Sequence, residues 1–203
     1  MTDEYVPLAE PLRSRVAAAR CATHEGLTTR LVPYGMEHRA RVIEMRNVPR
    51  SLAMLSRTSP HTLEEQTVWT QGYLERDNDM TFVIVDLRGQ VVGCTALYDI
   101  ESAGMTAMKG RLVVDETAVG PFALEAEILL IRLAFEQLGL KNMRTQSRPE
   151  NHKMLAINEK LGFVRAGLIP VRGHDEVDMN LVAADFHPEK FIPILEHWRK
   201  RLT

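Results

Sequence analysis

Two carboxylates, Asp99 and Glu101, end an apolar stretch, Val91–Tyr98, whose composition predicts a β-strand. A carboxylate that is partly removed from water has a raised pKa and can accept a proton from an ammonium group, directly or through a water molecule. Both residues are therefore candidates for a general base. A solvated turn is the commoner role for a carboxylate at a strand end, and Tyr98 fits a half-buried strand position better than a proton donor.

A second feature with chemical potential is the junction between residues 114 and 122. An apolar strand ending at Val114 is followed by a short loop, Asp115–Gly120, and then by a long predicted helix. Such a junction gathers backbone N–H groups at the positive end of a helix dipole, where a phosphate binds favourably. Because every α/β protein contains junctions of this kind, the junction alone is weak evidence for a phosphate site.

The remaining reactive side chains do not predict a metal centre. The seven histidines are scattered without the spacing of a metal-binding pair, and the two cysteines, Cys21 and Cys94, are too few for a disulfide framework. We therefore expect no metal and a reducing compartment.

Charge and hydropathy exclude further classes of protein. The formal net charge of -2 creates no field that would attract nucleic acid or an anionic membrane. No apolar run approaches the roughly 20 residues that cross a bilayer. The N-terminus lacks the basic and apolar regions of a secretory signal. We expect a soluble, cytoplasmic protein without a nucleic-acid or membrane partner.

The elements that position these groups follow from changes in hydrophobic period. The predicted helices are 12–20, 36–46, one beginning at Thr62, 121–138, 151–161 and 188–201, and the predicted strands are 27–34, 81–86, 91–98, 105–115, 142–147, 163–169 and 177–182. Thr62 and Glu65 have the spacing of a capping box, and Gly139 suits the position after a helix end. An antiparallel meander followed by strand, helix, strand, helix and a hairpin predicts a mixed sheet in an α/β or α+β domain.

The chain length favours one compact domain with additions at its ends. We expect an N-terminal arm or helix over residues 1–26, a main domain over residues 27–183, and a C-terminal helix over residues 184–203.

Two motifs in the second half resemble one known family. The run from Arg111 to Leu140 resembles the cofactor-binding segment of the GNAT superfamily of N-acetyltransferases. Pro149-Glu150-Asn151, followed after eight residues by Lys160-Leu161-Gly162-Phe163, resembles a second motif of that family at its usual spacing. The resemblance covers roughly residues 27–183 and is strongest to the ribosomal-protein and nucleotide-sugar N-acetyltransferase branch.

The resemblance implies a mixed, centrally splayed sheet flanked by helices, with acetyl-CoA held where two parallel strands separate. The cofactor-binding residues it implies are Leu112, Val113 and Val114 on the strand, Ala118, Val119, Gly120, Phe122 and Ala123 at the junction, and Asn151. Arg46 and Tyr98 are candidates for contact with the substrate, and a surface ion pair is the commoner role for an arginine such as Arg46. Asp99, Glu101 and Asn158 would be the candidates for proton transfer.

Three departures separate this chain from the family pattern. At the junction the family has R/Q-x-x-G-x-G/A, whereas this chain has Ala118 first and Pro121, which has no N–H, at the first glycine. Asn158 stands where many members place a tyrosine that protonates the leaving thiolate. The strand before Asp115 carries no carboxylate to act as a base.

The function that the resemblance implies is transfer of acetyl from acetyl-CoA to a primary amine by direct attack in a ternary complex. The acceptor is a small-molecule amine, with an amino sugar nucleotide slightly favoured over a protein N-terminal amine, and a drug-modifying enzyme would share the chemistry. A non-catalytic CoA-binding or interaction module is the alternative from another class. The sequence leaves a homodimer open.

Overall fold

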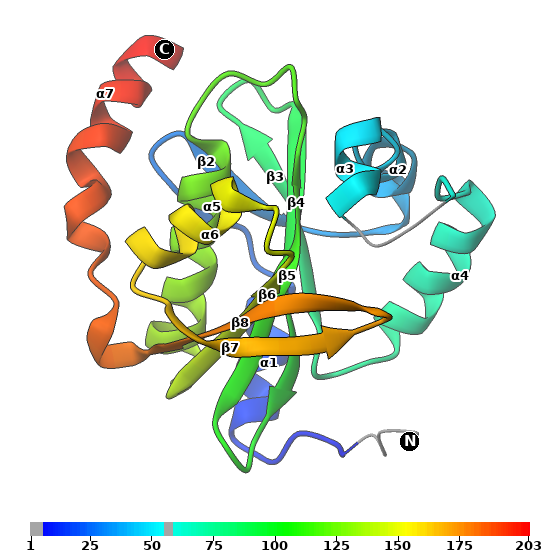
Figure 1. The fold of residues 1–203 in the computed structure, drawn as a ribbon, viewed down its shortest axis with the longest axis vertical. Helices are drawn as coiled ribbons and strands as arrows, with labels where there is room; N and C mark the ends of the chain where they lie inside the picture. Colours follow the sequence, from blue (N-terminus) through cyan, green and yellow to red (C-terminus); the bar gives the residue numbers. More distant parts are fainter. Residues whose placement is uncertain (1–5, 55–58) are drawn as a thin grey trace.

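The computed structural model describes residues 6–54 and 59–203, so the first five residues of the predicted N-terminal arm lie outside it. One eight-stranded sheet runs through the molecule in the order β1-β2-β3-β4-β5-β6-β8-β7 (Figure 1). Among the strand pairs of these described residues, only β5–β6 is parallel. The strands are β1 (His24–Glu25), β2 (Thr29–Pro33), β3 (Met80–Asp86), β4 (Val91–Glu101), β5 (Thr106–Val114), β6 (Asn142–Ser147), β7 (Val164–Val171) and β8 (His174–Val182).

Helices cover both faces of this sheet. The α-helices are α1 (Leu12–Arg20), α2 (Arg39–Arg46), α3 (Pro49–Met54), α4 (Leu63–Leu74), α5 (Phe122–Arg132), α6 (His152–Lys160) and α7 (Ile192–Leu202). Helices α5, α6 and α7 lie on one side of the central strands, and α2, α3 and α4 lie on the other (Figure 1). The prediction of a mixed α/β sheet flanked by helices is confirmed.

The capping residues predicted from the sequence act as expected. The Thr62 hydroxyl accepts from the Glu65 N–H at 3.1 Å, and the Glu65 carboxylate accepts from the Thr62 N–H at 3.0 Å, which starts α4. Gly139 has a φ of 72° and ends the long helix, whose last turn, Leu133–Gln137, is a π-helix. Helix α3 is not among the helices that the sequence predicts. Its first residue is Pro49, whose fixed φ suits the start of a helix.

Two hydrophobic cores pack on the two faces of the sheet. The larger core joins α5 to buried residues of α1, including Leu12 and Val16. The smaller core lies under α2 and α4 and includes Val42, Tyr73 and Val113. The N-terminal helix is therefore packed against the main core, although the division of the chain at residues 26 and 183 stays a prediction.

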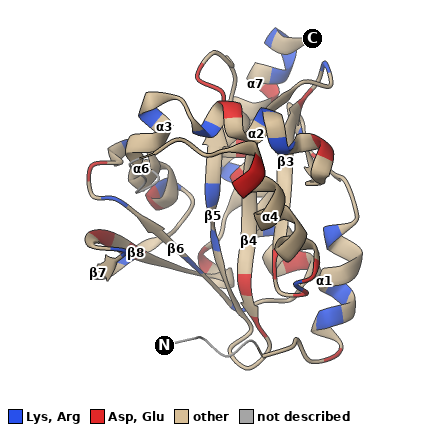
Figure 2. Ribbon diagram, turned by 90° about the vertical axis from the view of Figure 1, so that its right-hand side faces the viewer, with Lys and Arg blue, Asp and Glu red and all other residues tan. Residues whose placement is uncertain are grey.

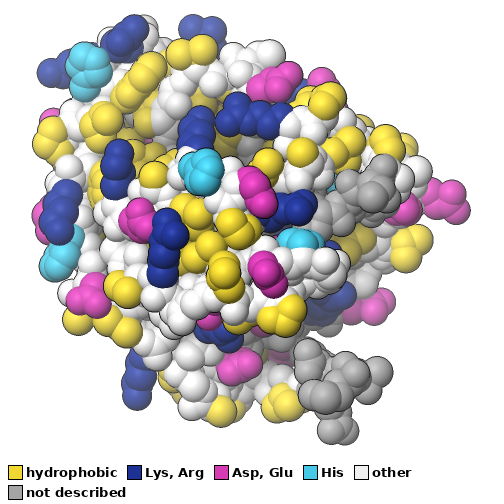
Figure 3. Space-filling model, in the orientation of Figure 1, with side chains coloured by type: hydrophobic (Ala, Val, Ile, Leu, Met, Phe, Trp, Pro, Cys, Tyr) yellow, Lys and Arg dark blue, Asp and Glu magenta, His cyan; other side chains and the backbone are white. Residues whose placement is uncertain are grey.

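Acidic and basic positions are mixed over the helices that face the viewer in Figure 2. On the face drawn in Figure 3, hydrophobic side chains gather near the centre and are bordered by charged ones. The predicted homodimer stays a prediction.

Within residues 6–54 and 59–203, no helix is both long and apolar enough to cross a membrane.

A buried carboxylate ties α5 to the loop before β2. The Glu125 side chain accepts from the Leu27 N–H at 2.5 Å, from the Thr28 N–H at 2.7 Å and from the Thr28 hydroxyl. Glu125 and Thr28 are both buried. These bonds satisfy polar groups that would otherwise be buried without partners.

We expect Glu125→Ala to lower the free energy of unfolding by about 3 kcal/mol, because it leaves the Leu27 and Thr28 donors without an acceptor. Chemical denaturation monitored by circular dichroism measures the difference. Glu136→Ala, on the exposed surface of the same helical segment, should change stability by less than about 1 kcal/mol. Equal losses in the two variants would contradict this role for Glu125.

Candidate functional site

The two parallel strands at the centre of the sheet separate part of the way along their length. Their pairing runs from Thr106↔Asn142 to Lys109↔Thr145 and ends there. Within the described residues, no strand pairs with the β6-facing edge of residues 110–114. Backbone N–H and C=O groups on this edge are free to bind an extended ligand as an additional strand would. The predicted residues Leu112, Val113 and Val114 lie on this segment.

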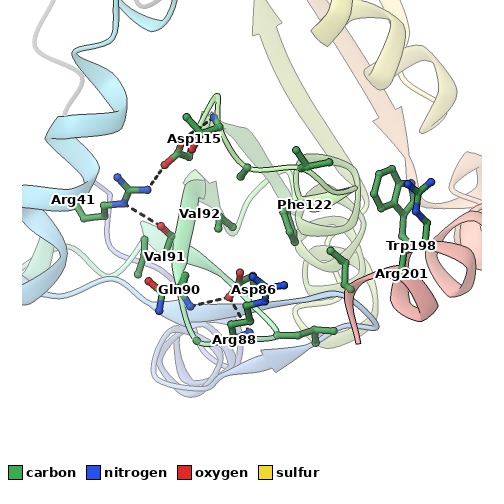
Figure 4. Close-up of a pocket in the computed structure, with 16 residues that line it drawn as sticks. Arg41, Asp86, Arg88, Gln90, Val91, Val92, Asp115, Phe122, Trp198 and Arg201 are labelled. Carbon is green, nitrogen blue, oxygen red and sulfur yellow. Dashed lines mark hydrogen bonds and ion pairs between the residues drawn. The ribbon is translucent and has the colours of Figure 1, made fainter.

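The loop after β5 is held in shape by Asp115. Its carboxylate accepts from the Thr117 N–H at 2.8 Å and the Thr117 hydroxyl at 2.7 Å, and its carbonyl accepts from the Ala118 N–H at 3.0 Å. The bonds from Thr117, together with the guanidinium of Arg41, lower the pKa of Asp115. Arg41 also donates to the Val91 carbonyl at 3.1 Å, so it joins α2, β4 and the loop (Figure 4).

Helix α5 begins directly after this loop. Pro121 is its N-cap residue and the first intrahelical bond is donated by Glu125, so the N–H groups of residues 122–124 have no acceptor within the helix. Phe122 is buried, and an added Cβ at Gly120 would lie 2.7 Å from its ring. A side chain at position 120 would therefore require the buried Phe122 ring to shift. Among the predicted junction residues, Ala118 donates its N–H to the Asp115 carbonyl, so this N–H is already used within the loop.

A cavity of about 800 Å³ lies against this loop (Figure 4). Its walls come from the β3–β4 turn, the loop after β5 and the end of α7, with Ala118, Val119 and Phe122 among the lining residues. Its size is within the range of small-molecule sites. No lining residue comes from β6 or α6, so the cavity flanks the loop and does not overlie the β5–β6 separation.

Helix α6 carries the two predicted asparagines at different depths. Asn151 is the N-cap, and its side-chain oxygen accepts from the Met154 N–H at 3.3 Å. Asn158 is fully buried, and its oxygen accepts from Lys109 Nζ at 2.9 Å. The structure thus places Asn158 beside the last residue of β5 that pairs with β6.

Two β-bulges displace side chains on β4 and β5. The register changes between Cys94↔Val113 and Ala96↔Gly110, and again between Tyr98↔Met108 and Glu101↔Thr106. Arg111, with a φ of 56°, and Asp99, with a φ of 49°, lie within these irregular segments. Positive φ is uncommon for residues other than glycine, and bulges re-aim side chains beside functional sites.

The Arg111 side chain occupies the centre of a cluster on the face that α4 covers. Its guanidinium lies 4.3 Å from the ring centroid of Tyr98 and 5.3 Å from that of Trp69. It donates to the buried carboxylate of Asp79 at 2.7 Å. Burial raises the pKa of Tyr98, and the nearby Arg111 opposes that shift.

The two candidate bases differ in their surroundings. Desolvation by neighbouring groups raises the pKa of Asp99; Arg111 opposes this shift, and the negative charge of Asp79 adds to it. Glu101 is exposed and accepts from the Thr106 hydroxyl at 3.4 Å in the turn to β5. Asp99 therefore lies in the electrostatic field of the Arg111 cluster, whereas Glu101 is bonded within the turn.

Arg46 lies at the end of α2, close to the first bulge. Its Nη2 is 3.9 Å from the Cys94 sulfur, and the Cys94 thiol donates to the Arg111 carbonyl at 3.5 Å. The Arg46 Nε atom is buried and has no hydrogen-bond partner among the described residues. A buried guanidinium N–H without an acceptor is costly, so this atom is suited to an acceptor atom of a ligand.

The structure brings together groups that the sequence analysis treated separately or missed. Tyr98 and Asp99 share one region with Asp79 and Arg111, two residues that were not predicted. Across the described residues, no group of three or more histidine, cysteine, aspartate or glutamate side chains has the arrangement of a metal site.

The mixed sheet, its separating parallel strands and the adjoining loop–helix junction define the class of GNAT-like α/β domains. The family model described as "Acetyltransferase (GNAT) domain" matches residues 29–164, and the chain belongs to this family. It is 24% identical over 108 residues to the SPbeta prophage-derived uncharacterized N-acetyltransferase YokL of Bacillus subtilis, a match that spans 53% of this chain and 60% of that relative.

Solved structures share the fold. A GCN5-related N-acetyltransferase from Brucella melitensis matches with a TM-score of 0.70 and 22% identity over 98% of this chain and 89% of its own. Mycobacterium smegmatis RimJ, solved with CoA-disulfide, matches with a TM-score of 0.70 and 20% identity over 82% of this chain and 88% of its own.

Proposed function

We propose that this protein is an acetyl-CoA-dependent N-acetyltransferase that acts on a primary amine. The observation that carries the proposal is the separation of β5 from β6 after Lys109↔Thr145, directly before a junction at which α5 presents free N–H groups. An extended thioester arm can bond to the free edge of β5 while its pyrophosphate lies at the helix N-terminus. Family membership supports the same chemistry.

The acetyl group would then lie near the bulge at Arg111. Backbone groups of Leu112, Val113 and Val114 would hold the pantetheine arm. Val119, Gly120 and the first N–H groups of α5, from Phe122 and Ala123, would receive the pyrophosphate. Asn151 would contribute its free amide N–H, since its oxygen is used by the helix cap.

The reaction is a direct attack of the amine nitrogen on the thioester carbonyl, which positioning in a ternary complex accelerates. The nitrogen forms a C–N bond, the C–S bond breaks, and the electron pair leaves with sulfur. A base must take one proton from the attacking nitrogen. We assign this role to Asp99, because its raised pKa makes it a stronger base than an ordinary carboxylate.

The acceptor we propose carries an oxygen-rich or anionic group next to its amine. The unpaired Nε of Arg46 supports this class, since a phosphate or carbonyl oxygen would satisfy it. An amino sugar nucleotide meets the requirement, and so does the peptide bond beside a protein N-terminal amine. The two acceptor classes are distinguished by the acetylation rates of wild-type protein and of Arg46→Gln, each measured with an amino sugar nucleotide and with a peptide that has a free N-terminal amine.

The test of cofactor binding is calorimetric titration with acetyl-CoA. Val119 suits a charge-placing variant better than Gly120, because its side chain is 72% exposed whereas a side chain at Gly120 would displace Phe122. We expect Val119→Asp to weaken binding about five- to tenfold, more at low salt, by repulsion of the pyrophosphate.

Val164→Asp is the matched control, since Val164 is 65% exposed and lies on β7. It should bind acetyl-CoA like wild-type protein. Equal affinity in Val119→Asp and wild type would contradict the assignment of the loop. Absence of binding to folded wild-type protein would favour the alternative of a non-catalytic module.

A further inference from the structure

Four buried polar side chains from four elements meet beside the point where β5 and β6 separate. Lys109 of β5 is 2% exposed and is ion-paired with Glu127 of α5, which is 0% exposed. Lys109 Nζ also donates to Asn158 Oδ1 at 2.9 Å and lies 5.2 Å from the centroid of the Phe163 ring. Thr95 of β4 donates to Glu127 at 2.9 Å.

Such a group is expensive to bury. Removing a lysine and a glutamate from water costs several kcal/mol per ion, and replacing a buried pair by apolar residues is often neutral or stabilising. Packing alone does not explain an ion pair at positions where the neighbouring core is apolar.

One hydrogen-bond donor of this group has no acceptor among the described residues. Asn158 Nδ2 is buried and has no hydrogen-bond partner among the described residues. Its orientation is fixed by charge, because the opposite amide orientation would place an NH₂ group against the lysine ammonium. Lys109 therefore holds the Asn158 oxygen and leaves an N–H donor free beside the last paired residue of β5.

We propose that Asn158 donates this N–H to the sulfur of CoA and that Lys109, held by Glu127, positions the amide and supplies positive charge. The inference rests on the proposed function, since it requires a CoA thioester along the free edge of β5. When the C–S bond breaks, the electron pair goes to sulfur, and the thiolate is stabilised by the Asn158 hydrogen bond and by the ammonium of Lys109. The proton from the amine passes to its base and then to water, and the thiolate takes its proton from water.

The pH dependence of CoA binding tests this inference. Stabilisation of the thiolate lowers the pKa of the bound thiol, so the affinity for CoA rises as the pH increases. Desulfo-CoA, which lacks the thiol, reports any pH dependence of binding that comes from the protein. The ratio of the CoA affinity to the desulfo-CoA affinity therefore isolates the contribution of the thiol. A hydrogen bond to a charged acceptor corresponds to about one to two pKa units, so we expect this ratio to rise about 10- to 100-fold between about pH 6 and pH 10.

Two variants locate the effect. Asn158→Leu removes the hydrogen bond but keeps the Lys109 ammonium, so it should lower the pH-dependent rise of the ratio about tenfold. The double variant Lys109→Met/Glu127→Leu removes both charges without leaving one unpaired, and it should lower the pH-dependent rise about tenfold. A cooperative thermal melt, together with an affinity for desulfo-CoA like that of wild-type protein, shows that each variant is folded.

The outcomes separate this inference from the proposed function. A flat ratio in a wild-type protein that binds both ligands overturns the role of Asn158 and Lys109 and leaves the acetyltransferase proposal standing. A rise that is as large in Asn158→Leu as in wild-type protein also overturns it. If the folded wild type binds neither ligand, both proposals fail.

Discussion

Replacing Lys109 alone by methionine should lower the free energy of unfolding by about 3–5 kcal/mol. Methionine fills a similar volume, but it leaves the Glu127 carboxylate fully buried with the Thr95 hydroxyl as its remaining hydrogen-bond partner among the described residues. It also leaves Asn158 Oδ1 without its donor. Urea denaturation at neutral pH measures the loss.

The double variant Lys109→Met/Glu127→Leu is the matched control for this prediction. It removes both ions, so most of the stability lost in the single variant should return. An additive loss in the double variant would contradict the pairing, because independent sites add and coupled ones do not.

Replacing Asp99 by asparagine should lower the rate of acetyl transfer by about 10²- to 10⁴-fold if Asp99 is the base. The substitution keeps the size of the side chain and removes its charge. Because Asp99 lies at an exposed position, the stability of the fold should not fall. The release of the CoA thiol in the presence of an amine acceptor measures the rate.

The dependence of the rate on pH provides a second test of Asp99 as the base. A base works when ionised, and desolvation raises the pKa of Asp99. The wild-type rate should therefore increase with pH, and the apparent pKa of this increase should lie above that of an ordinary carboxylic acid. This rising limb of the pH–rate profile should be absent in Asp99→Asn. Glu101→Gln should retain the limb, and the opposite result would transfer the role to Glu101.

Local patterns in the sequence predicted most of the elements because their causes are local. The Thr62–Glu65 capping box spans one helical turn, and Gly139 is needed where the chain turns with positive φ. Apolar alternation predicted the hairpins, and the junction after Val114 was evident from a strand that leads directly into a helix. The family motifs then predicted the splayed sheet and the family to which the chain belongs.

The tertiary structure alone decided which polar groups meet. Asp79 and Arg111 are 32 residues apart, and Lys109 reaches Asn158 across 49 residues. Glu127 has no feature in the sequence that separates it from Glu125, yet it faces Lys109 while Glu125 faces the loop before β2. Helical and strand periods give the face on which a residue lies, whereas bulges and strand order decide its neighbours. Only the packing of β5 against α5 and α6 brings Lys109, Glu127 and Asn158 together.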